Sequence, residues 1–210
     1  MRIDLDPLDC LEPTGFMNFE HPDIQACLAG LHVEGLTAKD KAVRLFNFVR
    51  DGIEYEFLAK LERHEYAASH VLALGRGFCV QKAVLLCALG RAAGLPTAIV
   101  MTDLRDRTLP ARVVEAIGTD TLLYHGLTAF YLGGCWVRAD ATHSPELAQR
   151  KGYRLVHFDG TRDALMSPTT VSGEPHIEYP RWYGAYRDLP FDAMAAAFRA
   201  AYGRTEVTGR

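Results

Sequence analysis

Cys79 is the residue whose neighbours are best suited to chemistry. Gly75 and Gly77 stand just before it, and glycines let the backbone bend sharply and let a substrate approach. The apolar run after Cys79 predicts a buried helix that begins at this cysteine, where the positive end of the helix dipole favours a thiolate. Backbone N–H groups at the same helix start can stabilise an oxyanion. This pattern indicates a nucleophile that attacks a carbonyl carbon.

The other four cysteines are interpreted as packing residues. Cys87 lies within the stretch "RGFCVQKAVLLCALGRAAGLP", residues 76–96, where burial raises the pKa of a thiol and removes access to it. Cys10, Cys27 and Cys135 are typical of small core or surface residues. Five cysteines without a C-x-x-C pair do not predict a disulfide framework. A reduced, cytoplasmic setting is therefore expected.

The residue pattern predicts helices early in the chain and antiparallel strands later, which is an α+β class. Apolar spacing predicts helices over residues 21–31, 38–53, 78–92 and 191–203, and a short helix that ends at Gly75. Thr37 is the expected cap of the helix over residues 38–53, and Ser69 that of the short helix. Strands are expected over residues 97–104, 124–132 and 135–142. Residues 153–160 and the stretch that follows to Leu189 are expected to form strand and loop, and residues 1–20 a short strand or arm. No linker divides the chain, so one domain is expected over residues 1–210, with its core at about 38–142.

A glycine pair at residues 133–134 predicts a two-residue hairpin turn. Such a turn pairs Leu132 with Cys135. Continuing the same register places His125 and Asp140 on one face of the sheet as diagonal neighbours. A carboxylate within reach of an imidazole holds its tautomer and supports its positive charge. The hairpin therefore predicts a histidine–aspartate pair that could serve Cys79.

Three separated segments resemble, in order, the motifs of the transglutaminase-like cysteine enzyme superfamily. "AVRLFNFVRDGIEYEF" is similar to the family's first helix, and "GRGFCVQKAVLLCALGRAAGLPTAIV" to its glycine-preceded cysteine helix and following strand. "HGLTAFYLGGCWVRADAT" resembles the family's histidine strand, hairpin and aspartate strand. The resemblance spans residues 38–142, and beyond residue 150 it is to small stand-alone bacterial members. One departure is that residues 126–129 are Gly, Leu, Thr and Ala, where the family usually carries a W-x-E type stretch.

The resemblance implies a papain-like core, in which a cysteine-bearing helix packs on an antiparallel sheet. It also implies a triad in which Cys79 attacks an amide carbonyl, His125 takes and later delivers a proton, and Asp140 orients His125. Release of the acyl-thioenzyme to water, as in a protease or amidase, is favoured because water is always present and a small domain offers little surface for two protein substrates. Two alternatives are an acyltransferase or transglutaminase, which transfers the acyl group to an amine, and a catalytically silent binding module. The intact residue set argues against the silent module.

Four further residues are candidates for oxyanion stabilisation or substrate contact. Tyr55 could donate a hydrogen bond from the segment before the cysteine helix, as aromatic donors do in larger members of the family. Gln81 is the weaker donor, because two positions along a helix turn a side chain by about 200°. Arg76 could bind a substrate carboxylate, and Trp136 could line the cleft. His143 is expected at the cleft mouth, and without a close ligand pair around it no metal is expected.

Composition excludes several other classes of function. The chain has 210 residues with a formal net charge of −3 and no clustered basic surplus, which argues against a nucleic-acid partner. No apolar run approaches the roughly 18 residues of a membrane span. The first ten residues include aspartates where a signal peptide would need an apolar stretch. The Gly-x-Gly before the cysteine lacks the lysine of a phosphate-binding loop, so no cofactor is expected. A peptide, a protein or a small amide is the expected substrate, and the sequence does not indicate the oligomeric state.

Overall fold

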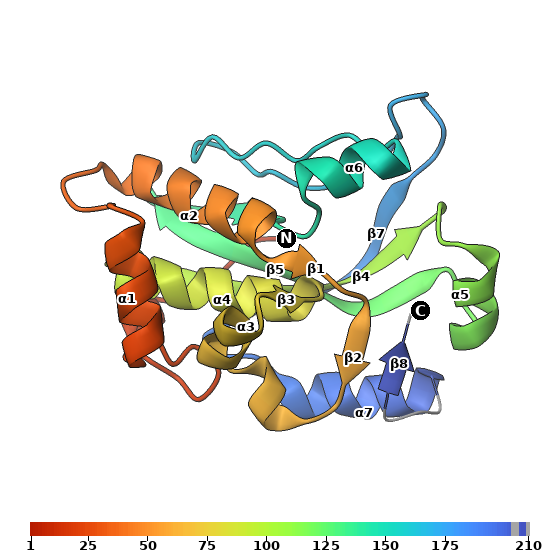
Figure 1. The fold of residues 1–210 in the computed structure, drawn as a ribbon, viewed down its shortest axis with the longest axis horizontal. Coiled ribbons are helices and arrows are strands. Elements are labelled where there is room, and N and C mark those ends of the chain that lie inside the picture. The colour runs from red at the N-terminus through yellow and green to blue at the C-terminus, as the bar shows by residue number, and fades with distance from the viewer. Residues whose placement is uncertain (203–205, 209–210) are drawn as a thin grey trace.

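A buried helix packed on an antiparallel sheet forms the centre of the molecule, in a computed structural model that describes residues 1–202 and 206–208 (Figure 1). The sheet has the strand order β6-β5-β4-β7, and every neighbouring pair is antiparallel. Its strands are β4 (Thr97–Asp106), β5 (Thr121–Leu132), β6 (Cys135–Ala139) and β7 (Ile177–Tyr186). Helix α4 (Cys79–Ala92) packs against β5 and β4, and α2 (Ala38–Gly52) and α3 (Ala68–Leu74) pack against α4. The α+β class and the helix-on-sheet core are confirmed.

Helix α4 is buried on almost all sides, as its apolar sequence predicts. Every residue from Cys79 to Arg91 is buried. The helix ends at Ala92, and Gly94 follows with a φ of +78°, a left-handed conformation that suits glycine. A helix enclosed in this way has little freedom to shift, so its first residue, Cys79, is held in a fixed position.

The hairpin between β5 and β6 has the predicted register. Gly133 and Gly134 have φ values of +58° and +86°, the left-handed pair that a type I′ turn requires. Leu132 pairs with Cys135, and the ladder continues to the pair Thr128–Ala139. Strand β6 ends there, one residue before Asp140, whose N–H donates to the carbonyl oxygen of Ala164 (2.9 Å). The aspartate therefore leaves the ladder just beyond the end of the strand.

A β-bulge lies directly before His125 in strand β5. Thr102 of β4 pairs with His125, but the next pair along the ladder is Leu104 with Leu122, so two residues of β5 face one residue of β4. Tyr124 occupies the bulge with a φ of +52°, which is uncommon for a residue with a side chain. Bulges bend a strand and redirect the side chains beside them. This bulge sets the direction of the His125 side chain.

Gly126, the residue after His125, lets β5 approach the start of α4 closely. A Cβ atom at Gly126 would lie 2.8 Å from the Cα atom of Val80, which is closer than real contacts allow. The glycine stands in the segment that departs from the family's usual W-x-E pattern. Its missing side chain brings the strand that carries His125 against the helix turn that carries Cys79.

Shorter elements surround this core. The remaining helices are α1 (Pro22–Gly30), α5 (Ala111–Ile117), α6 (Pro145–Lys151), α7 (Phe191–Tyr202) and 3₁₀ turns at Asp9–Leu11 and Arg63–Tyr66. Strands β1 (Glu54–Tyr55) and β3 (Arg76–Gly77) form a parallel pair beside the start of α4, and β2 (Leu58–Lys60) pairs with β8 (Glu206–Thr208). None of the helices among the described residues is long and apolar enough to cross a membrane.

Several predicted elements are wrong in detail. Residues 153–160 form no strand, and residues 1–20 carry a 3₁₀ turn in place of a strand. Ser69 lies inside α3, which begins at Ala68, and it accepts its hydrogen bond from Asn18. Thr37, in contrast, caps α2 as predicted, since its hydroxyl accepts from the N–H of Asp40 (3.2 Å).

Candidate active site

Cys79 is the first residue of α4, and its side chain is 7% exposed. The first N–H groups of a helix have no acceptor within the helix, so those of Cys79 and Val80 stand beside the thiol with the positive end of the helix dipole. The N–H of Phe78, one residue earlier, donates to Oε1 of Gln81 (3.2 Å). That bond fixes the chain at the point where it enters the helix.

His125 lies between the thiol and a carboxylate. Its Nε2 is 2.8 Å from Oδ2 of Asp140. Cys79 is close enough to the ring for its charge to raise the pKa of the imidazole. The histidine is 2% exposed and the aspartate 1% exposed. The structure thus brings together the three residues that the sequence proposed, in the order thiol, imidazole, carboxylate.

Asp140 is held by groups that favour its ionised form. Its Oδ1 accepts from the N–H of Thr142 (3.1 Å), and the hydroxyl of Tyr179 donates to Oδ2 (3.4 Å). Burial alone would raise the pKa of this carboxyl, but the interactions with His125 and Thr142 bring it below its usual value. Asp140 is therefore a carboxylate at neutral pH.

The charges around His125 favour its protonated form. Burial would lower the pKa of the imidazole, but the charges of Cys79 and Asp140 and the hydrogen bond to Asp140 raise it to about 10. The histidine is therefore an imidazolium at neutral pH, beside a buried carboxylate and a thiol.

Lys82 is a residue that the sequence reasoning missed. It lies one helical turn after Cys79, is 1% exposed, and donates from Nζ to the carbonyl oxygens of Ile53 (2.6 Å) and Arg50 (3.2 Å). Burial lowers the pKa of its amine to about 7, while Asp140 acts in the opposite direction as the largest opposing charge. A lysine within an apolar helix run was the available signal, because lysine is almost never fully buried without a partner.

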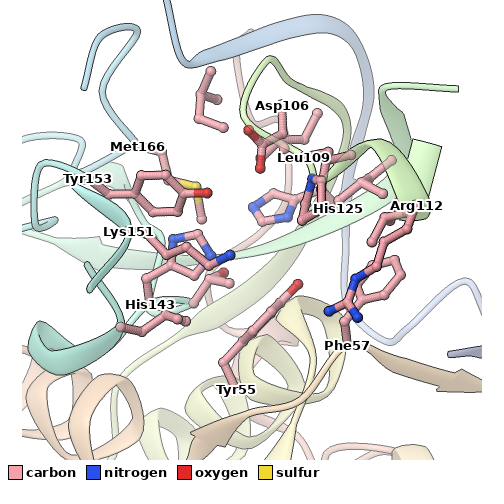
Figure 2. A pocket seen from close by; sticks show the side chains of 17 residues that line it. Tyr55, Phe57, Asp106, Leu109, Arg112, His125, His143, Lys151, Tyr153 and Met166 are labelled. Carbon is pink, nitrogen blue, oxygen red and sulfur yellow. The ribbon is translucent and has the colours of Figure 1, made fainter. Parts of the chain in front are cut away.

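Tyr55 and Gln81, the two candidate oxyanion donors, lie in different surroundings. Tyr55 ends β1 beside Gly77, and its hydroxyl points into the cavity shown in Figure 2. Burial and the charge of Cys79 raise the pKa of its phenol well above its usual value, so it remains a hydrogen-bond donor. The Gln81 amide is already engaged, because its Nε2 donates to the carbonyl oxygen of Glu65 (2.9 Å) and its Oε1 accepts from Phe78.

Arg76 and Trp136 lie apart from the cavity beside His125. Arg76 forms an ion pair with Glu56 (3.1 Å) and lines a separate groove. Trp136 packs edge-on against Tyr131 (5.3 Å between ring centres) and lines a third depression near the N-terminus. Neither side chain is among those that line the cavity of Figure 2.

His143 lines this cavity, as expected for a residue at a cleft mouth. Its ring contacts the rings of Tyr55 (5.2 Å) and Tyr153 (5.3 Å). Burial lowers the pKa of His143 to about 4, so it is neutral at neutral pH. No group of three or more histidine, cysteine, aspartate or glutamate side chains suited to a metal ion occurs among the residues that the structure describes.

Comparison with known proteins identifies a family and a related fold. The family model of the transglutaminase-like superfamily matches residues 28–141, more than half of the chain. A structure from Cytophaga hutchinsonii described as a "putative cysteine protease" has the same fold, with a TM-score of 0.53 and 18% sequence identity. That match covers 91% of this chain but 51% of the other, so this chain spans about half the length of its neighbour.

A second structure, a "putative protease" from Parabacteroides distasonis, gives a TM-score of 0.40 and 12% identity over 65% of this chain and 26% of that one. That likeness is too weak to support an argument. No curated protein matches the chain.

Proposed function

Since the chain belongs to the transglutaminase-like superfamily, we propose that it is a cysteine enzyme that hydrolyses amide or peptide bonds. The observation that carries this proposal is the position of His125, whose Nε2 is 2.8 Å from the buried Asp140 and whose ring lies close enough to Cys79 to feel its charge. Thiolate, imidazolium and carboxylate in this order are the groups that acyl transfer to a thiol requires.

The proposed reaction has two steps. The Cys79 thiolate attacks the carbonyl carbon, and His125 gives its proton to the amine as the carbon–nitrogen bond breaks. Water then attacks the thioester, His125 takes a proton from that water, and the carboxylic acid leaves as the thiolate re-forms. The negative oxygen formed in each step would accept from the N–H groups at the start of α4 and from the hydroxyl of Tyr55.

Transfer of the acyl group to an amine is the second candidate, because the same thioester reacts with either nucleophile. A binding module without turnover is the third. The presence of Cys79, His125 and Asp140 together in one site supports an enzyme over a binding module.

An acyl-enzyme trap tests the proposal. Protein mixed with a panel of peptide p-nitroanilides and quenched in acid should carry an added acyl mass, and peptide mapping should place it on Cys79. The Cys79→Ala variant should carry none, while Cys87→Ala should acylate like the unmodified chain. Addition of a primary amine separates the first two candidates, since a transferase diverts product from the free acid to the amide. An acyl mass on another residue, or none with any donor, would contradict the proposal.

A further inference from the structure

The cavity beside His125 has mostly apolar walls. It has a volume of about 210 Å³, and Figure 2 shows side chains from several separate elements converging on it. Its apolar walls include Leu104, Leu109, Val113, Leu122, Met166 and Ile177. An apolar cavity of roughly 150 Å³ is enough to bind benzene in a protein core. The space can therefore hold a branched aliphatic or an aromatic side chain.

Charges of both signs border the cavity. Asp106 is 7% exposed, and its Oδ1 accepts from the N–H (2.8 Å) and the hydroxyl (2.6 Å) of Thr108. Arg112 and Lys151 also line the cavity, are exposed to solvent, and form no ion pair with any residue that the structure describes. An anionic group in the cavity would be attracted by the two exposed basic side chains and repelled by the buried carboxylate of Asp106, and a cationic group would meet the reverse. Each charged group therefore meets at least one like charge, whereas a neutral group meets none.

A neutral polar group is also disfavoured. A carboxamide loses its hydrogen bonds to water when it enters an apolar space, and this costs free energy unless the protein replaces each of them. An apolar side chain loses nothing comparable and gains from its burial. Cys79 is not among the residues that line the cavity, but His125 and Tyr55 are, so a side chain held there would lie beside two groups of the proposed reaction.

We infer that this cavity receives the side chain of the acyl donor and selects apolar residues, such as leucine or phenylalanine, over glutamine and charged residues. This inference rests on the proposed function, and it separates the protein from an enzyme that uses glutamine as acyl donor. The expected substrates are peptides or amides with an apolar residue on the acyl side of the cleaved bond.

A matched donor series tests the selection. N-acetyl-aminoacyl coumarin amides with leucine, phenylalanine, glutamine, lysine and glutamate differ only in the side chain that the cavity would receive. The kcat/KM values for leucine and phenylalanine should exceed the other three by about tenfold or more, the discrimination typical of an apolar pocket. Equal or higher values for glutamine, lysine or glutamate would overturn the inference, and a preference for lysine would identify Asp106 as the selecting group.

Filling the cavity gives an independent test. Val113, on α5, is 9% exposed and lines the cavity, so Val113→Trp should lower kcat/KM for the leucine donor about tenfold or more, and by a larger factor than for a glycine donor. Leu74→Trp is the control, because Leu74 is 46% exposed in the separate groove of Arg76, and it should change neither donor. Unchanged use of the leucine donor by Val113→Trp would overturn the inference.

Failure of this inference is distinguishable from failure of the proposed function. Peptide aldehydes with the same five side chains should protect Cys79 from iodoacetamide in the same order of preference, and this needs no turnover. If Cys79 is alkylated and all five aldehydes protect it equally, the cavity does not select the side chain, although Cys79 remains the nucleophile. A Cys79 that neither reacts nor is protected would overturn the proposed function itself.

Discussion

Among the residues that the structure describes, two buried histidine–aspartate pairs differ in geometry and in charge. His125 and Asp140 are joined by a 2.8 Å contact between Nε2 and Oδ2. His176 and Asp106 are 3.9 Å apart, and neither ring nitrogen of His176 has a hydrogen-bond partner in the structure. Both histidines are 2% exposed, so burial does not distinguish them.

The difference lies in what surrounds each ring. Burial lowers the pKa of His176, and the carboxylate of Asp106 does not reverse this. The same effect of burial acts on His125, but the charges of Cys79 and Asp140 and the hydrogen bond to Asp140 raise its pKa to about 10. A histidine beside an aspartate therefore becomes a proton donor at neutral pH only when hydrogen bonds hold the charged form. Only the His125 pair meets that condition.

Replacing each histidine by glutamine should separate the two pairs most strongly. His125→Gln removes the group that moves the proton, and kcat should fall by about 10³-fold or more. His176→Gln should change kcat less than tenfold, since His176 has no hydrogen bond to lose. Steady-state hydrolysis of the leucine donor measures both. A loss of similar size in both variants would mean that the two pairs act as one unit.

The aspartates give the next largest contrast. Asp140→Asn leaves an amide beside Nε2, so kcat should fall by about 10²–10⁴-fold. The same change removes a charge that raises the pKa of His125, so the alkaline limb of the kcat profile should move to lower pH. Asp106→Asn should leave kcat for the leucine donor within tenfold and leave that limb in place. An unmoved limb in Asp140→Asn would contradict the assigned electrostatics.

Lys82 should have a smaller effect on the same chemistry. Burial lowers the pKa of Lys82 to about 7, and the carboxylate of Asp140 is the largest charge that supports its ammonium form. Lys82→Met keeps the length of the side chain without the charge, so kcat for the leucine donor should fall about tenfold at pH 6.5, where the ammonium form prevails, and by less at pH 8.5. Urea unfolding provides the control, because a purely structural role would lower stability without making the loss of kcat depend on pH.

The smallest expected effect concerns stability in acid. The pKa of His143 falls from 6.5 to about 4 on folding, so the unfolded chain binds a proton in this interval that the folded chain does not. The free energy of unfolding should therefore decrease as the pH falls from 6.5 to 4, by on the order of 3 kcal/mol from this group. His143→Asn should remove most of that decrease in urea titrations at pH 4.5 and 7. An identical slope in the variant would assign the acid sensitivity to other groups.

Turns, helix caps and buried helices were predictable where neighbouring residues in the sequence determine them. The glycine pair 133–134 specifies its own turn, so the register from Leu132 and Cys135 was predictable. The buried run after Cys79 and the cap at Thr37 were likewise readable from neighbouring residues. The residue pattern over 153–160 was misleading, because this stretch packs without forming a strand.

The finer features of the site depend on distant contacts. The bulge at Tyr124 arises from the pairing of β4 with β5, and the close approach at Gly126 depends on α4. Lys82 finds its acceptors at the end of α2, about thirty residues earlier in the chain. The cavity likewise collects side chains from α5, α6 and β7, and no spacing within one segment could indicate such a meeting.

The reactivity of Cys79 relative to Cys135 tests the central claim most directly. Cys135 is exposed, whereas Cys79 is 7% exposed, so accessibility alone would make Cys135 the faster thiol. With limiting iodoacetamide at pH 6, peptide mapping should find Cys79 alkylated at least tenfold faster than Cys135, because Cys79 lies at the start of α4 beside the imidazole of His125, the surroundings of a reactive thiol. His125→Gln should abolish that advantage. Faster alkylation of Cys135, or equal rates for both thiols, would contradict the account.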